Sequence, residues 1–98
     1  MDLEIAIVAA KDGNAAALVD AMTNGGGIAA LESAPGCRSA RVLPGVEHPE
    51  NVLFLVEWDS VEAHNAGKDS EGFRRFVQIA GPFFGGSGSM QHFRDSQA

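Results

Sequence analysis

Three histidines are the side chains of this 98-residue sequence best suited to proton transfer at neutral pH. An unperturbed imidazole titrates at about pH 6.5, so it can remove a proton from a substrate or donate one to a developing oxyanion. His48 lies in a proline-flanked loop, which predicts a surface position. His64 follows a strongly apolar stretch, and His92 lies in the last segment of the chain. We therefore expect His64 and His92 to be the catalytic residues.

A purely structural interpretation of these two histidines stays open. His64 could be a helix-surface or packing residue that forms a local hydrogen bond. His92 could be a satisfied histidine on a strand, at the edge of a pocket or at a dimer interface. The sequence does not decide between the two roles, since histidine is intermediate between typically buried and typically exposed residues.

Aromatic side chains could line a small-molecule site beside these histidines. Trp58 shares a strand face with Phe54 and Val56, and its indole could stack on an aromatic substrate or simply pack in the core. Pockets for small molecules are mostly apolar, although phenylalanines at helical spacing also describe an ordinary core helix. Arg41 could donate to a phenolate, or it could be a solvated arginine at a sheet edge. The expected substrate-binding residues are Trp58, Phe73, Phe76, Phe83 and Arg41.

The remaining chemistry-bearing residues exclude several kinds of site. Cys37 is the only cysteine, so the chain forms neither an internal disulfide nor a cysteine metal cluster. No histidine pairs with an acid at clear metal-ligand spacing. The glycine run at 24–27 lacks the neighbours of a phosphate loop, and 85–89 do not form a nucleophile elbow. We therefore expect no metal and no cofactor, and hydrolase, metalloenzyme and dehydrogenase functions are disfavoured.

The charge of the chain limits its partners. Thirteen acidic residues outnumber seven scattered basic ones, which gives a net charge of −6. A phosphate backbone would be repelled, so we expect no nucleic-acid partner. The N-terminal segment has no basic start of a signal peptide, and no apolar run reaches the roughly 20 residues of a membrane span. The sequence therefore predicts a soluble cytoplasmic protein that does not bind membranes.

Apolar runs and helix-breaking residues divide the chain into strands and helices. Residues 52–56 are five apolar residues in a row, which favours a strand that is buried on both faces. Glycines 25–27 predict an interruption of the first helix, because each would cost roughly 1 kcal/mol relative to alanine. Glycines within 85–88 predict a flexible turn before the last strand. The expected strands are 3–9, 37–43, 52–58 and 89–94, and the helical segments are 15–22, 28–33, between Ser60 and Gly67, and between Ser70 and Gly81.

These elements follow the order β-α-β-β-α-β, with a hairpin in the middle. This order is typical of the ferredoxin-like α+β fold, a four-stranded antiparallel sheet with both helices on one face. We expect a single domain over residues 1–98, with a polar tail at 93–98. The strands carry apolar residues on both faces, so the face without helices needs a cover that removes it from water. The sequence therefore predicts a homodimer formed by sheet-to-sheet packing.

Five stretches of the chain carry a family resemblance: PGCRSARVL at 35–43, PENVLFLVEW at 49–58, VEWDSVEAHNAGKDSEGFRRF at 56–76, GPFF at 81–84 and MQHF at 90–93. Together they resemble the antibiotic biosynthesis monooxygenase family. The resemblance extends over nearly the whole sequence and implies the fold of the dimeric α/β barrel superfamily, with a pocket between sheet and helices. The haem-degrading relatives carry a histidine where this chain has Lys68, so haem cleavage is disfavoured. The chain also departs from the family pattern at 24–27 and lacks tyrosine.

This resemblance implies a chemistry that needs neither metal nor flavin. A base deprotonates an electron-rich substrate, the anion gives an electron to O2, and nearby donors hold the negative oxygen. The implied function is a cofactor-independent monooxygenase that oxidises a small phenolic, quinol or polyketide-like aromatic. Two alternatives stay open: a non-catalytic small-ligand-binding or stress-associated dimer, and an isomerase or lyase of the same fold.

Overall fold

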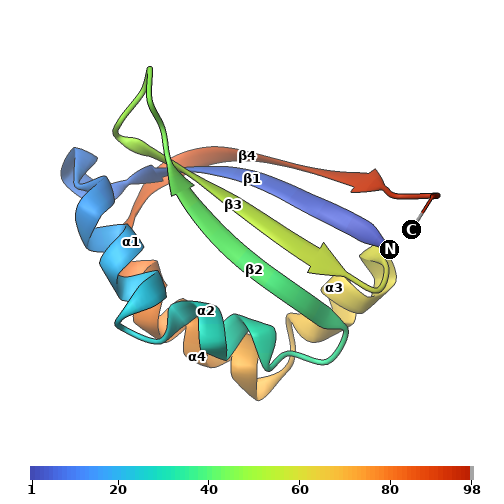
Figure 1. Ribbon diagram of the computed structural model, residues 1–98. Coiled ribbons are helices and arrows are strands. Elements are labelled where there is room, and N and C mark those ends of the chain that lie inside the picture. The colour runs from blue at the N-terminus through green and yellow to red at the C-terminus, as the bar shows by residue number, and fades with distance from the viewer. Residues whose placement is uncertain (98) are drawn as a thin grey trace.

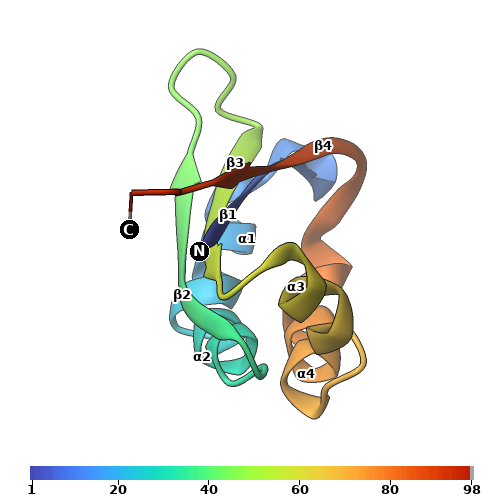
Figure 2. The same ribbon diagram turned by 90° about the vertical axis from the view of Figure 1, so that its right-hand side faces the viewer.

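Four antiparallel strands form one curled sheet in the computed structural model, which describes residues 1–97 apart from the side chain of Ser87. The strands are β1 (Asp2–Ala10), β2 (Cys37–Pro44), β3 (Asn51–Trp58) and β4 (Phe84–Arg94). They lie in the order β2-β3-β1-β4 (Figure 1). The helices cover one face of the sheet, and no helix of the described residues lies on the other face (Figures 1 and 2). This arrangement confirms the predicted ferredoxin-like α+β fold.

The helices begin where the sequence supplies capping side chains. Asn14 accepts the backbone N–H of Ala17 at the start of α1, and Ser60 accepts that of Ala63 at the start of α3. Each cap satisfies a backbone donor that would otherwise lack a partner. No helix in the described part of the chain is both long and apolar enough to cross a membrane. The helices are α1 (Ala15–Thr23), α2 (Gly27–Glu32), α3 (Val61–Gly67) and α4 (Glu71–Ala80), with short 3-10 helices η1 (Lys11–Gly13) and η2 (Gly81–Phe83).

The glycine run between α1 and α2 interrupts the first helix, as predicted. Gly26 has a φ of +88°, in the left-handed region that residues with a side chain rarely adopt. A Cβ on Gly27 would lie 2.6 Å from Sδ of the buried Met22. The break therefore lets α2 change direction while its first turn packs tightly against the end of α1.

β3 shows how the sheet separates buried from exposed positions. Its side chains alternate between a fully covered face and a half-buried face. On the second face, the ladder partners of Leu53 are Ile7 and Leu43, which are 43% and 37% exposed. The second face of β3 therefore stays partly exposed in the described part of the chain. The residues of β3 buried under the helices are Val52, Phe54, Val56 and Trp58.

The prediction of a flexible turn at Gly85–Gly88 is wrong, because β4 already begins at Phe84. The glycines lie within a strand that runs close to the backbone of β1. A Cβ on Gly85 would lie 2.7 Å from the carbonyl oxygen of Ala10, and one on Gly88 would lie 2.3 Å from that of Ile7. The ladder is also irregular between Val8 and Ala10. Glycine at these positions therefore allows the backbones of β4 and β1 to approach closely.

Candidate active site

The register of the sheet brings two acids and two basic side chains together at one end. On β1, Asp2 pairs with Arg94 of β4, and Glu4 pairs with His92. On the other side of β1, Asp2 pairs with Trp58 of β3. All five residues lie at positions of the same parity as the buried residues of β3, so they share the helix-covered face. The candidate site therefore forms where this face meets α3.

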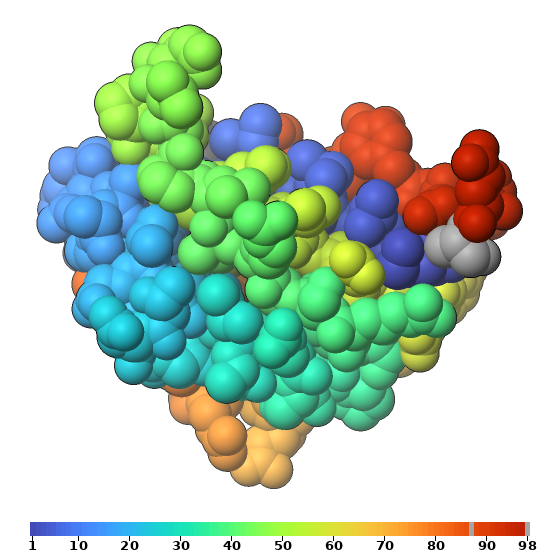
Figure 3. Space-filling view, in the orientation of Figure 1, coloured from blue at the N-terminus to red at the C-terminus, as the bar shows by residue number. Residues whose placement is uncertain are grey.

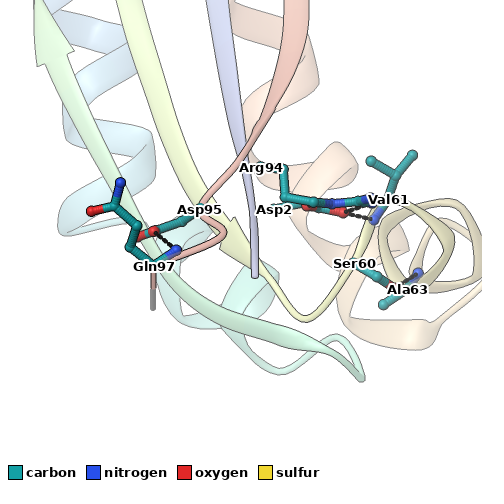
Figure 4. Close-up of polar contacts among 7 residues, drawn as sticks. All are labelled: Asp2, Ser60, Val61, Ala63, Arg94, Asp95 and Gln97. Carbon is teal, nitrogen blue, oxygen red and sulfur yellow. Dashed lines mark hydrogen bonds and ion pairs between the residues drawn. The ribbon is translucent and has the colours of Figure 1, made fainter.

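Asp2 ties three elements together (Figure 4). Its Oδ2 accepts the backbone N–H of Val61 at 2.8 Å, at the start of α3. Arg94 donates to both carboxylate oxygens, from Nε at 2.9 Å and from a terminal nitrogen at 3.1 Å. These bonds, that of Arg94 foremost, lower the pKa of Asp2 to about 2. The first turn of α3 is thus anchored to β1 and β4.

His64, one turn further along α3, is almost completely buried. Its ring stacks on Trp58, with centroids 4.5 Å apart and an angle of 13° between the planes. Its Nδ1 lies 2.8 Å from Nε2 of His92, and its Nε2 lies 3.4 Å from Oε1 of Glu4. Burial, followed by the charges of Lys68 and His92, lowers the pKa of His64 to about 4. His64 is therefore neutral at neutral pH.

Glu4 completes a chain of polar contacts that ends at His92. The indole N–H of Trp58 donates to Oε1 of Glu4 at 2.9 Å. Burial raises the pKa of the Glu4 carboxyl, while this hydrogen bond acts in the opposite direction. His92 is only half-buried, and Met90, the preceding residue on the same face of β4, is 51% exposed. The Glu4–His64–His92 chain therefore runs from the interior toward solvent, and His92 is its outer end.

The same three side chains raise the question of a metal ion. Glu4, His64 and His92 each offer one ligand atom, and these atoms lie within 4.8 Å of one another. Imidazole and carboxylate donors suit divalent transition metals. The 2.8 Å between the two imidazole nitrogens is a direct hydrogen bond, shorter than the roughly 3.3 Å between two nitrogens on tetrahedral zinc. Such a metal would have to displace this bond, and the arrangement as it stands is suited to proton transfer.

The expected substrate-binding residues occupy three different places. Trp58 is fully buried, and one face of its indole is covered by His64. Phe76 is buried and Phe73 packs beside it, with ring centroids 5.4 Å apart. Phe83, in η2, is 36% exposed. Arg41 pairs with Leu55 on the face without helices, opposite to the histidines. The structure thus brings Trp58 to the histidines but leaves Arg41 on the other side of the sheet.

The phenylalanines form an aromatic cluster between the sheet and α4. Phe54 lies edge-on to Phe76 and to Phe84, with ring centroids 6.2 Å and 5.9 Å apart. Phe73 packs on the outer side of Phe76. Edge-to-face contacts of this kind stabilise a core in addition to the apolar area that they bury. This part of the predicted site is packed as core in the described structure.

His48 and a shallow hollow lie on the hairpin between β2 and β3, away from these residues. His48 is exposed, as predicted, and lies 3.7 Å from a carboxylate oxygen of Glu50. A hollow of about 290 Å³ lies beside it, lined mainly by apolar side chains that include Ile7, Leu43 and Leu53. Figure 3 shows the hairpin rising from the body of the molecule. This hollow opens on the face without helices, so it is not the space beside His64.

Sequence reasoning missed Glu4, Asp2 and Arg94. Each acid interrupts an otherwise apolar first strand at alternate positions, which places both on one face. That pattern is a usable signal, because a charged side chain on a buried strand face requires a partner. The partners themselves lie between 54 and 92 positions away in the sequence, so no local spacing identifies them.

Comparison with known proteins identifies the chain by family and by fold. The family model described as antibiotic biosynthesis monooxygenase matches residues 3–79. A solved structure from Bordetella bronchiseptica, named as a candidate member of that family, has a TM-score of 0.84 at 20% identity, over 96% of this chain and 95% of its own. A similarly named protein from Caulobacter crescentus CB15 has a TM-score of 0.75 at 15% identity, over 98% and 90%. These likenesses show a shared fold.

A third similar structure, from Nitrosomonas europaea, carries the same kind of name. It has a TM-score of 0.74 at 11% identity, over 98% of this chain and 99% of its own. No curated protein matches the sequence significantly. The chain and these three structures correspond over nearly their full lengths.

Proposed function

This chain belongs to the antibiotic biosynthesis monooxygenase family, and we propose that it is a cofactor-independent monooxygenase acting on a small phenolic, quinol or polyketide-like aromatic. The observation that carries this proposal is the hydrogen bond between His64 and His92. It joins a half-buried imidazole to a neutral, buried one, and so offers a proton acceptor, His92, that a neutral partner holds in place. A base is what this chemistry requires of the protein.

The reaction proceeds from an activated methylene flanked by phenolic or carbonyl groups. His92 removes one proton, and the resulting anion transfers an electron to O2. The two radicals combine in a carbon–oxygen bond, and His92 returns a proton to the terminal peroxide oxygen. Loss of the second methylene proton then breaks the O–O bond. One oxygen atom remains as a new carbonyl and the other leaves as water, so the substrate supplies all four electrons that reduce O2.

Oxygen uptake by chelator-treated protein with anthrones and dihydroxynaphthalenes tests this proposal. We expect uptake above the uncatalysed background, with a loss of about tenfold or more in His92→Ala, since general-base catalysis commonly supplies at least that factor. His48→Ala is the matched control, because His48 is exposed on the distant hairpin. Uptake at background level, or equal uptake in His92→Ala and wild type, would overturn the proposal. Substrate loss without oxygen uptake would favour the isomerase or lyase alternative.

One observation favours a second candidate, a non-catalytic dimer that binds a small ligand. Trp58 is fully buried and stacks on His64, and the rings of Phe54, Phe76 and Phe84 all pack against one another. These contacts fill the part of the core where the expected pocket lies. Thermal stabilisation by an aromatic ligand, without turnover or oxygen uptake, would support this candidate over the oxygenase.

The proposal includes a homodimer formed through the face of the sheet without helices. Ile7, Leu43 and Phe93 on this face are exposed, and Leu53 and Leu55 are half-buried between them. Covering these side chains would gain roughly 25 cal/mol for each Å² of apolar area removed from water.

Substitution at the centre of this face should break the dimer. We expect Ile7→Asp to convert the dimer to a monomer in light scattering after size exclusion, because it would bury an unpaired charge. Glu62→Gln, on α3, is a control that should leave the dimer intact. A wild-type monomer at micromolar concentration would rule out this part of the proposal.

A further inference from the structure

Glu4 is a carboxylate on the helix-covered face of the central strand β1. Its Oε1 accepts the indole N–H of Trp58 at 2.9 Å. The same oxygen lies 3.4 Å from Nε2 of His64, slightly longer than an ordinary hydrogen bond. A carboxylate oxygen has two lone pairs, so it can face both rings as an acceptor.

This acceptor determines which nitrogen of His64 carries the hydrogen. A lone pair on Nε2 would be repelled by the Glu4 oxygen, so Nε2 carries the hydrogen and Nδ1 carries the lone pair. Nδ1 of His64 lies 2.8 Å from Nε2 of His92, so the hydrogen of that bond belongs to His92. Nδ1 of the half-buried His92 ring is then left with a lone pair. The assignment follows outward from Glu4, one ring at a time.

We infer that Glu4 is a positioning residue that fixes the tautomers of His64 and His92, and thereby makes Nδ1 of His92 the proton acceptor. This inference deepens the proposed function and depends on it only for the source of the proton. When Nδ1 of His92 takes a proton, its Nε2–H continues to donate to Nδ1 of the neutral His64, which holds the protonated His92 ring in place.

The groups packed around His64 keep its ring neutral in the free protein, so the position of its single hydrogen determines which of its nitrogens is an acceptor. Lys68 follows α3, His92 faces it from β4, and Glu4 faces it from β1. Burial and the first two of these groups keep the ring neutral at pH 7, with a pKa of about 4. A neutral imidazole carries one hydrogen on one of two nitrogens, and its partner on β1 is an acceptor. Glu4 is thus placed to select Nε2.

Nitrogen-15 NMR of the imidazole rings in the free protein at pH 7 tests this inference without substrate. We expect both His64 and His92 to carry hydrogen on Nε2. Glu4→Met removes the acceptor and should move His64 toward the Nδ1–H form, while Glu4→Gln keeps an oxygen facing Trp58 and should retain Nε2–H. Glu57→Met is the matched control, because Glu57 lies on the other face of β3, opposite Leu3. It should leave both tautomers unchanged.

The outcomes separate the role of Glu4 from the proposed function. Nδ1–H on His64 in the wild type, or unchanged tautomers in folded Glu4→Met, would overturn the role of Glu4 even in an active oxygenase. If Glu4→Met does not fold, loss of Nε2–H in Glu4→Gln would overturn it. The expected tautomers without oxygen uptake would support the role of Glu4 and overturn the oxygenase. With an active substrate, Glu4→Met should lower kcat more than it changes KM.

Discussion

Asp2 and Glu4 lie two residues apart on the same face of β1, yet the pKa of Asp2 is lowered from its ordinary value and that of Glu4 is raised. Each has a partner on β4 and a contact on α3. Asp2 meets the guanidinium of Arg94, and its pKa falls to about 2. Glu4 lies opposite His92 and close to the neutral His64, and burial raises its pKa. A permanent cation stabilises the first carboxylate, whereas the second depends on neutral donors.

This difference separates a structural ion pair, Asp2–Arg94, from a series of titratable side chains, Glu4, His64 and His92. We call Asp2, Arg94 and the Val61 N–H the Asp2 row, and Glu4, Trp58, His64 and His92 the Glu4 row. Arginine stays charged at all physiological pH values, so the Asp2 row holds α3 in place with both of its side chains charged. The Glu4 row contains groups whose protonation can change. The Asp2 row links α3 to β4. At the spacing that results, His64 of α3 and His92 of β4 come within hydrogen-bond distance in the Glu4 row.

As the pH falls, the stability contributed by the Glu4 row, and by His64 above all, should be lost first and to the largest extent. His64 has a pKa of about 4 in the folded protein against 6.5 unperturbed. Its contribution to stability is complete above pH 6.5 and is lost as the pH falls toward 4, by up to roughly 3 kcal/mol. Glu4 acts in the opposite sense, because its raised pKa favours the protonated folded state. Urea unfolding between pH 7 and pH 4 measures the sum.

His64→Gln isolates the contribution of the histidine to this pH dependence. We expect a flatter stability curve between pH 6.5 and 4 than in the wild type. Equal slopes in the two proteins would contradict the burial of a neutral His64.

Removal of the Glu4 acceptor should have a smaller but distinct effect on stability. Glu4→Met leaves the buried indole N–H of Trp58 without its partner, and we expect a loss of about 1–3 kcal/mol in the free energy of unfolding at pH 7. Glu4→Gln keeps an acceptor oxygen for Trp58 and should cost less than Glu4→Met. Chemical unfolding followed by tryptophan fluorescence measures both, since Trp58 is the only tryptophan. Equal losses would mean that the charge of Glu4, rather than its acceptor oxygen, stabilises this row.

Neutralisation of Asp2 should produce the smallest change at neutral pH. Asp2→Asn can still accept the Val61 N–H but loses its ion pair with Arg94; Asp2 is buried, yet the guanidinium of Arg94 is largely exposed, so solvent and salt screen the pair and its contribution is small. The wild-type carboxylate contributes stability above pH 3.8 and loses it as the pH falls through about 2, so the difference between the two proteins is present at neutral pH and disappears in acid. We expect Asp2→Asn to remove this low-pH part of the stability curve in 0.1 M salt. An unchanged acid transition would show that Arg94 does not stabilise Asp2 in solution.

The fold was readable from the sequence because its signals are local. The apolar run of β3, the caps at Asn14 and Ser60, and the glycine break before α2 each depend on neighbouring residues. The error at Gly85–Gly88 shows the limit of such rules. Glycine is common in turns, but here it permits close approach to a strand that lies far away in the sequence.

The candidate site was readable only in part, because its contacts depend on register. His64 and His92 could be singled out by residue type, but their contact depends on the packing of α3 against β4. The role of Glu4 depends on its position opposite His92 in the β1–β4 ladder. Arg41 shows the converse, since its residue type suits an anion although its strand face points away from the histidines.

The closing of β1 against β4 has a consequence for protein engineering. The backbone N–H of Asp95 donates to the carbonyl oxygen of Met1 at 2.9 Å, so the two ends of the described chain lie side by side. A short linker could join them, and new termini could be opened in the exposed hairpin around Val46. Such a permuted chain would bring Asp2 and Arg94 close together in sequence as well as in space, and would leave the histidine pair inside one uninterrupted segment.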